Sequence, residues 1–290
     1  MRVSRSGYYS YLESRRKTDI DPDDRLVFEI KLLHKKSRGS YGSRRMAKAL
    51  SMSGYIVGRH KVRRLMRENG VSCKQRRRYK VTTKSDSSLP VAENLLNRNF
   101  EAQKPNEKWA TDITYLWTNE GYLYLAAVID LFSRRIVGWA MADNMQTDLV
   151  EKAFSMAMLR RCPEAGLLHH SDRGSQYTSL QYRQLLDTTG VVASMSRKGN
   201  CWDNAVMERF FGSLKSEQTD DKCYATRAEI ESDVIDYIET FYNTERLHST
   251  LNYMSPADYE ANFEGDIKSK LSFSVESRMK TALPAAEARL

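Results

Sequence analysis

Apolar and polar positions divide the chain into a helical first part and a later part in which strands and helices alternate. Over residues 22–37, apolar residues recur three and four positions apart at Leu26, Ile30 and Leu33, with acids at the start and lysines at the end. This spacing and charge order are typical of an amphipathic helix whose dipole is complemented at both ends. We therefore predict a helix over residues 22–37.

Residues 43–70 predict two short helices around a turn at Ser53 and Gly54. Inward-facing apolar side chains recur in both helices and are Met46, Ala49 and Leu50, then Val62, Leu65 and Met66. Basic residues are available on the outside of the second helix and are Arg59, Lys61, Arg63, Arg64 and Arg67. Two helices around a glycine-containing turn are a helix-turn-helix pattern, which places its second helix in the DNA major groove. The same pattern also occurs in helical hairpins that bind nothing.

After Pro105 the pattern changes to three runs of aromatic and β-branched residues separated by short turns, which predicts an antiparallel meander. The runs are residues 108–117, 122–132 and 134–142. Beyond them we predict helices at 147–161 and 179–189, strands at 166–171 and 191–196, and helices at 203–219 and 226–243. This order predicts an α/β fold: a mixed five-stranded sheet with flanking helices, preceded by a small all-α domain.

Changes in composition give four predicted regions. Residues 1–72 form a helical DNA-binding region, and residues 73–104 form a basic and polar linker without a regular period. Residues 105–262 form the α/β core. Residues 263–290 form a tail for which the sequence suggests no role.

The positive charge of the chain is concentrated in one region. The 290 residues carry a formal net charge of +9. Residues 34–84 hold 17 lysines and arginines against the single acid Glu68, so the remainder of the chain is net negative. Such a block predicts a surface for nucleic acid phosphates. The alternative is a solvated basic face without a partner.

The cysteines and the apolar runs argue against several classes of protein. Cys73, Cys162, Cys201 and Cys223 form no CxxC pair, which argues against a disulfide framework and against a structural zinc site. The sequence has no run of eighteen apolar residues and no apolar stretch typical of a signal peptide. We therefore expect a cytoplasmic protein that does not enter a membrane.

Three acids occupy positions from which their side chains can converge. Asp112 lies within the first predicted strand, Asp172 ends the fourth, and Glu208 lies on the helix that follows the fifth. On that helix, Asn204, Glu208 and Lys215 share one face. Carboxylates without histidine or cysteine ligands suit Mg²⁺ or Mn²⁺, and two such ions support in-line phosphoryl displacement. Taken singly, each acid has an ordinary alternative role in a turn, in a cap or on a solvated helix face.

Four segments place these acids in a known context, and they are "WATDIT", "HHSDRGSQY", "SMSRKGNCWDNAVMERFFGSLKSE" and "YNTERLHSTLNYMSP". Together they closely resemble the DDE transposases of the bacterial insertion sequence 3 family, in their second-reading-frame (OrfB) product, which are relatives of retroviral integrases. The 35 residues between Asp172 and Glu208 agree with the family spacing. Residues 43–70 resemble the helix-turn-helix of the same family, and the likeness extends to about residue 260.

The resemblance implies an RNase H-like integrase catalytic core. In it, Asp112, Asp172 and Glu208 would be the catalytic residues and the ligands of two Mg²⁺ or Mn²⁺ ions. The implied reaction is metal-dependent cleavage at the 3′ ends of an insertion sequence, followed by attack of the freed 3′-OH on target DNA. The implied partners are double-stranded DNA, further copies of the chain in at least a dimer, and an upstream-frame OrfA partner or fusion. The expected location is at the bacterial nucleoid.

Further residues are predicted to contact DNA. The family pattern suggests Lys215, Asn204, His170, Arg173 and Gln176, and the basic block adds Arg59, Lys61, Arg63, Arg64, Arg67, Arg76, Arg77 and Arg78. The alternative role of Lys215 is a solvated helix charge, that of Asn204 a hydrogen bond at a helix N-terminus, and that of His170 support of its loop. Asn243, Arg246 and His248 match the closing motif of the family, where a structural role is favoured.

Two other functions compete with transposition by this chain. The first is a non-catalytic DNA-binding regulator or an inactive transposase relic, and intact acids at all three positions argue against it. The second is an enzyme that only cuts DNA, which would share the same core chemistry.

Overall fold

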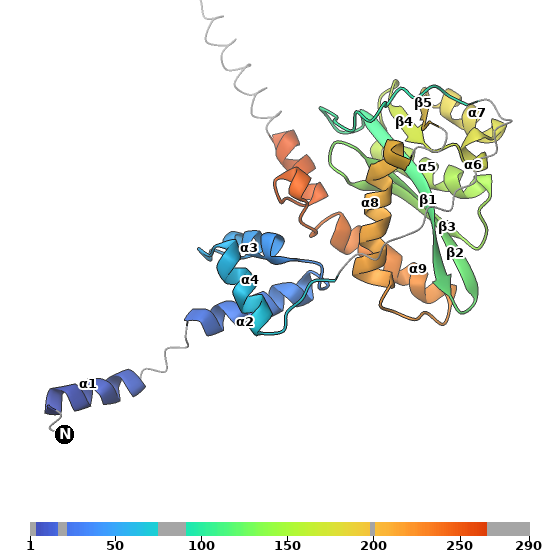
Figure 1. Cartoon of the computed structure of the whole chain (residues 1–290). Coiled ribbons are helices and arrows are strands. Elements are labelled where there is room, and N and C mark those ends of the chain that lie inside the picture. Colours follow the sequence, from blue (N-terminus) through green and yellow to red (C-terminus); the bar gives the residue numbers. More distant parts are fainter. Residues whose placement is uncertain (1–3, 17–21, 75–90, 198–200, 266–290) are drawn as a thin grey trace, which may run out of the picture. The chain divides into compact units, whose positions relative to one another are not determined.

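The computed structural model describes residues 4–16, 22–74, 91–197 and 201–265. The chain divides into two compact units, Met1–Lys74 and Gln75–Leu290 (Figure 1). Among the described residues, every helix is too short or too polar to cross a lipid bilayer.

The first unit is helical, as predicted. Its elements are α1 (Arg5–Arg16), α2 (Pro22–Lys36), α3 (Ser43–Met52) and α4 (Arg59–Glu68). The predicted helix over 22–37 and both helices of the helix-turn-helix pattern are confirmed, whereas α1 was not predicted. The turn after α3 passes through Gly54 at a φ of 86°, a left-handed conformation that glycine adopts without strain. The apolar residues predicted to face inward, from Met46 to Met66, are buried between α2, α3 and α4.

The second unit is built on a mixed sheet of five strands in the order β3-β2-β1-β4-β5. The strands are β1 (Lys108–Thr118), β2 (Gly121–Asp130), β3 (Ile136–Ala142), β4 (Leu168–Ser171) and β5 (Val192–Met195). Strands β1, β2 and β3 pair antiparallel, while β4 pairs parallel with both β1 and β5. The predicted meander and the predicted mixed sheet are therefore confirmed.

Helices cover both faces of the sheet (Figure 1). One core cluster lies between the sheet and α5 (Thr147–Arg161), α6 (Ser175–Thr178) and α7 (Leu180–Thr188). The other lies between the sheet and α8 (Ala205–Leu214) and α9 (Arg227–Asp236). Short 3₁₀ turns occupy Cys201–Asn204 and Ser249–Leu251, and residues 256–265 are helical.

Two of the predicted helices change their winding part-way. The helix predicted over 203–219 passes from α8 into a π-helical turn, η2 (Lys215–Thr219). The helix predicted over 226–243 passes from α9 into a second π-helical turn, η3 (Tyr237–Tyr242). Apolar periodicity does not distinguish the two windings over a single turn. The short α6 was likewise missed, because its four residues read as a turn.

Residues 91–104 correct the prediction of a linker that extends to residue 104. Leu96 is buried in the core beside α8, and the backbone N–H groups of Leu95 and Leu96 both donate to Ser194 Oγ of β5, at 3.0 and 3.1 Å. Asn94 and Arg98 bond the buried carboxylate of Asp203, each at 2.9 Å. This stretch therefore packs on the α/β unit as an irregular strap, which we call the entry strap. A segment held through backbone N–H groups needs no apolar period, so the sequence pattern missed it.

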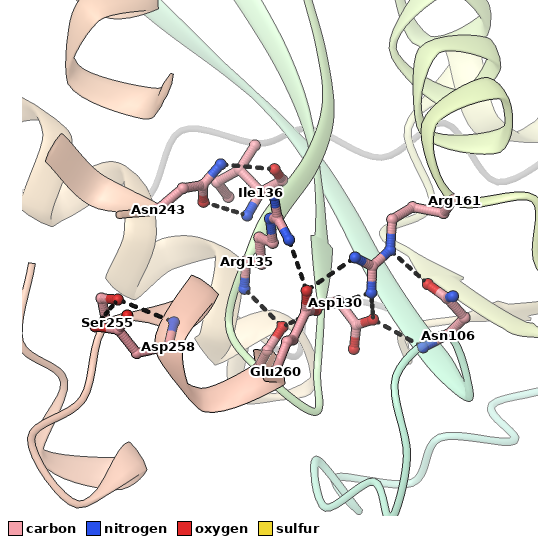
Figure 2. Close-up of polar contacts among 10 residues, drawn as sticks. Asn106, Asp130, Arg135, Ile136, Arg161, Asn243, Ser255, Asp258 and Glu260 are labelled. Carbon is pink, nitrogen blue, oxygen red and sulfur yellow. Dashed lines mark hydrogen bonds and ion pairs between the residues drawn. The ribbon is translucent and has the colours of Figure 1, made fainter. Parts of the chain in front are cut away.

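A buried ionic network joins three elements at the end of β2 (Figure 2). Arg161, in the last turn of α5, bonds Glu260 at 2.8 and 2.9 Å and Asp130 at 3.4 Å. Arg135 bonds the same Glu260 carboxylate at 2.7 Å, and the Asn106 N–H donates to Asp130 at 2.8 Å. Burial raises the pKa of Asp130 to about 6, while the two arginines and Ser133 hold the pKa of Glu260 below its usual value despite burial. The network fixes the 256–265 helix to the sheet.

Asp130 gives this fold a defined pH dependence. A carboxyl whose pKa is raised in the folded state adds stability below its unfolded pKa of about 4 and loses it as the pH rises through about 6. The free energy of unfolding of the wild type minus that of Asp130→Asn should fall by about 2 kcal/mol between pH 4 and pH 7. Urea denaturation at four pH values measures it. The exposed Asp143→Asn should give a constant difference, and a constant difference for Asp130→Asn would contradict the assignment.

Candidate active site

Asp112 lies within β1, and Asp172 directly follows β4, the parallel strand beside it. The pairing of β1 with β4 sets Lys108 opposite Leu168 and Ala110 opposite His170. Two more residues along each chain lead to Asp112 and Asp172. Because neighbouring strands are about 4.8 Å apart, we expect these two acids to lie close together where β4 ends.

The start of α8 is held against the same strand. Asn204 Nδ2 donates to the Thr111 carbonyl oxygen at 3.2 Å, directly beside Asp112. Glu208 follows in the first turn of α8 and is exposed. Asn204 Oδ1 is buried and has no hydrogen-bond partner among the described residues.

Electrostatics show that the three acids act on one another. The pKa of Asp112 is raised well above its usual value, first by burial, then by the charge of Asp172 and, to a lesser degree, by that of Glu208. The Ile113 N–H, 2.8 Å from Asp112 Oδ1, and the charge of Lys215 oppose this shift. Burial also raises the pKa of Asp172, against a hydrogen bond from the Gly174 N–H at 2.9 Å. The site thus concentrates negative charge that a cation would relieve.

The donor set suits a hard divalent cation, although its members are not drawn together. In the ranges that the structure describes, no group of three or more His, Cys, Asp or Glu side chains is arranged to hold a metal ion. Asp112 lies on β1 and Asp172 directly follows β4, whereas Glu208 stands on a helix with an exposed side chain. Oxygen ligands alone are what Mg²⁺ and Mn²⁺ prefer. The oxygen donors of these residues therefore fit such an ion in their chemistry.

Comparisons with known proteins match both units of the chain. Residues 102–201 and 208–262 match two profiles that are each described as an integrase core domain, and residues 21–79 match an HTH-like domain. The chain is 45% identical over 261 residues to the "Insertion element IS600 uncharacterized 31 kDa protein" of Shigella sonnei, covering 90% of this chain and 96% of that protein. It is 38% identical over 262 residues to "Transposase InsF for insertion sequence IS3A" of Escherichia coli, covering 90% and 91%.

The chain belongs to the insertion sequence 3 family of transposases. It is also 45% identical over 233 residues to the transposase of insertion sequence element IS904 of Lactococcus lactis, covering 80% of this chain and 92% of that one. Among solved structures, it is similar to the HTLV-2 integrase catalytic core domain, at 14% identity and a TM-score of 0.44 over 55% of this chain and 99% of that chain. The predicted family, the integrase core and the function in transposition are confirmed, and a transposase with this core is a polynucleotidyl transferase.

Lys215 of this transposase is a buried cation and not the solvated helix charge that was its alternative. It begins η2, is only 8% exposed, and its Nζ lies 4.8 Å from the centroid of the Tyr115 ring. Burial lowers its pKa, while the charges of Asp220 and Asp112 act in the opposite direction. Lys215 therefore places a positive charge between the acids and the aromatic residues of β1.

Two of the predicted DNA contacts of the core are corrected by the structure. His170 is fully buried, with Nδ1 at 2.9 Å from Ser194 Oγ and Nε2 at 3.1 Å from Ser196 Oγ, and burial lowers its pKa to about 4. Its ring supports the loop and has no surface to offer DNA. Asn204 is also buried, and it bonds β1, not its own helix N-terminus.

Arg173 and Gln176 are partly exposed beside the acids but already bonded. Arg173 Nε donates to the Ser196 carbonyl oxygen at 2.7 Å, and Gln176 Nε2 donates to the Met145 carbonyl oxygen at 2.8 Å. Both bonds hold the "HHSDRGSQY" loop in place.

The basic residues of α4 lie on two different sides of the helix. Arg59, Arg63 and Arg67 recur every four residues, are exposed, and form no ion pair within the described part of the chain. Lys61 and Arg64 are exposed too, but both pair with Asp23 of α2, at 2.5 and 3.2 Å. Arg76, Arg77 and Arg78 lie outside the described residues.

Sequence reasoning missed several residues that support the site. Asp203 is fully buried directly before α8, where it binds the entry strap and Arg197. Glu217 of η2 is buried and bonds Arg246 at 2.6 and 2.8 Å and the Tyr237 hydroxyl at 2.7 Å. The only signal for either acid was its place inside a motif of the family, since neither stands in an apolar run that would mark it as costly.

Proposed function

We propose that this transposase cleaves the 3′ ends of its insertion sequence and joins the freed 3′-OH groups to target DNA, in a reaction that depends on divalent metal. The observation that carries the proposal is the juxtaposition of Asp112 on β1 and Asp172 directly after β4, with the pKa of Asp112 raised first by burial and then by the charges of Asp172 and Glu208. Structural groups seldom gather three acids in this way, because like charges destabilise one another.

Each residue then has a distinct role. Asp112, Asp172 and Glu208 would hold two Mg²⁺ or Mn²⁺ ions through their carboxylate oxygens. Such ions, when bound, activate the attacking oxygen and stabilise the leaving one in an in-line displacement. Lys215 binds the phosphate next to the acids with its buried ammonium group. No covalent enzyme intermediate is needed, so the serines and tyrosines around the site only shape it.

The same proposal extends to partners. Arg59, Arg63 and Arg67 would bind phosphates of double-stranded DNA along α4, as the exposed face of the second helix of a helix-turn-helix does. At least two copies of the chain would act on a pair of transposon ends, with an upstream-frame OrfA partner or fusion supplying further end recognition. A protein of this kind acts at the nucleoid, in the cytoplasm.

A strand-joining assay tests the proposed reaction. Purified full-length protein with Mn²⁺ should join a pre-cut end oligonucleotide to a target plasmid, and EDTA should stop the joining. Mg²⁺ should support the same reaction. DNA binding without any cleavage or joining in either metal would favour the non-catalytic regulator, and cleavage without joining would favour an enzyme that only cuts.

Salt dependence tests the proposed role of α4. Each cation that neutralises a phosphate adds about 0.9 to the slope of log K against log salt concentration. Arg63→Ala combined with Arg67→Ala should therefore weaken DNA binding and lower the slope by about 2. Fluorescence anisotropy titrations at several salt concentrations measure it. Lys152→Ala, which removes an exposed cation paired with Asp148 on α5, is the matched control. An unaltered slope in the double variant would exclude the α4 assignment.

A further inference from the structure

Four aromatic side chains form one surface near the tip of the β1–β2 hairpin. Cross-strand pairing sets Tyr115 opposite Tyr124 and Trp117 opposite Tyr122, so the four rings stand on the same face of the sheet. The ring centroids of Trp117 and Tyr122 are 4.9 Å apart, those of Tyr115 and Tyr122 are 5.3 Å apart, and those of Tyr122 and Tyr124 are 6.4 Å apart. We call these four residues the aromatic platform.

The platform is open where the rest of the face is covered. Trp117 is 62% exposed, Tyr122 44% and Tyr115 41%. Further along the same face, Ala126 and Ala140 are buried beneath α5. Contiguous exposed rings of this kind mark an interaction site, because a folded protein otherwise removes such surface from water.

The platform begins close to the acids on the same strand. Tyr115 and Trp117 follow Asp112 by three and five residues, which is about 10 and 17 Å along β1. Their side chains point to the opposite face from Asp112. However, the pairing of β1 with β4 ends at Ala110, and no described strand pairs with that side of β1 beyond it. No described strand therefore separates the acids from the platform along this edge of β1.

Lys215 connects the two surfaces. Its ammonium nitrogen lies 4.8 Å from the centroid of the Tyr115 ring, and its charge lowers the pKa of Asp112. Lys215 is placed to bind the phosphate of a nucleotide. The base of the same nucleotide can then reach the aromatic platform. Binding sites for single-stranded DNA combine these two elements, a positive charge that follows the backbone and aromatic rings on which bases stack.

We propose that the aromatic platform stacks unpaired DNA bases next to the cleaved phosphate and so keeps the end of the transposon open at the acids. The proposal rests on the function proposed above, which puts that phosphate at Asp112. A second copy of the chain is the competing occupant. It is less suitable, because three half-exposed rings bordered by Lys215 supply only part of the roughly 800 Å² that each partner of a stable complex buries.

Two DNA probes test the platform with the full-length protein. One is a duplex with three unpaired nucleotides at one end, and the other is the same duplex fully paired. Any base sequence serves, because stacking accepts every base. We expect Trp117→Ala to weaken binding of the forked probe about tenfold and that of the paired probe less than twofold. Trp117→Phe, which keeps a ring, should retain most of the preference. Leu159→Ala, at an 81% exposed position on α5, should change neither.

If Trp117→Ala weakens binding of both probes equally, or of neither, the proposed role of the platform is wrong. A dimer in sedimentation without DNA that Trp117→Ala dissociates would assign the rings to a second copy and overturn it too. The function proposed above fails separately, when Asp172→Asn still joins DNA. Loss of joining in Asp172→Asn together with an unchanged fork preference in Trp117→Ala would leave the function standing and remove the platform alone.

Discussion

Asp172→Asn is expected to lower the rate of strand joining by about three orders of magnitude and to leave DNA binding intact. The change keeps the size of the side chain but removes a charge that, beside Asp112, would hold the metal ion. Joining of a pre-cut oligonucleotide measures the rate, and anisotropy measures binding. Because burial already raises the pKa of Asp172, removal of its charge should not destabilise the fold.

Asp187→Asn is the matched control for that experiment. It removes an exposed carboxylate from α7, away from the strand ends, and should join DNA at the wild-type rate. Unchanged joining by Asp172→Asn would reject the three-acid site altogether. Loss of joining in both variants would point to damage to the fold, which thermal unfolding would reveal.

Arg246→Met is expected to lower the free energy of unfolding by about 3–5 kcal/mol. Arg246 and Glu217 are both buried, and Glu217 accepts two hydrogen bonds from the guanidinium group and one from Tyr237. Removal of the arginine leaves a buried carboxylate without its cation, which is the most costly way to break such a pair. Chemical denaturation measures the loss.

Two further variants separate the buried charge from other effects of that substitution. Combining Arg246→Met with Glu217→Gln removes both charges and should recover part of the lost stability. Arg160→Met breaks a much more exposed ion pair with Glu239 and should cost only about 0–1 kcal/mol. A cost for Arg246→Met as small as that for Arg160→Met would show that the Glu217 pair does not stabilise the π-helical turns.

The regular part of the fold could be predicted from apolar periodicity. The meander, α5 and the two helices of the helix-turn-helix lie within a residue or two of their predicted bounds, because each buries one continuous face. The entry strap could not be predicted in this way. Its order depends on hydrogen bonds to Ser194 and Asp203, which are a hundred residues away in the sequence.

The candidate site could be predicted only as a set of positions. Spacing and family resemblance selected Asp112, Asp172 and Glu208, and the pairing of β1 with β4 leads to the two aspartates, whose charges act on each other. The burial of the neighbouring side chains could not be predicted. His170 and Asn204 were expected at the DNA surface, yet they lie inside, because their partners on β5 and β1 approach only in the folded chain. Lys215 is buried at the start of a π-helical turn, which a 3.6-residue period does not predict.

Gly138 of β3 allows α5 to pack closely on the sheet, and the loop before α5 contacts the segment that carries Asp172. A Cβ atom at this position of β3 would lie 2.2 Å from the Ala153 carbonyl oxygen and 2.8 Å from the Ala157 Cβ, so α5 rests on bare backbone. The loop before α5 ends at Gln146 and supplies the Met145 carbonyl oxygen that holds Gln176. Any side chain at position 138 would push α5 outward and take that loop with it. A copy of the insertion sequence that acquires Gly138→Ala can therefore lose transposition, although all three acids are intact.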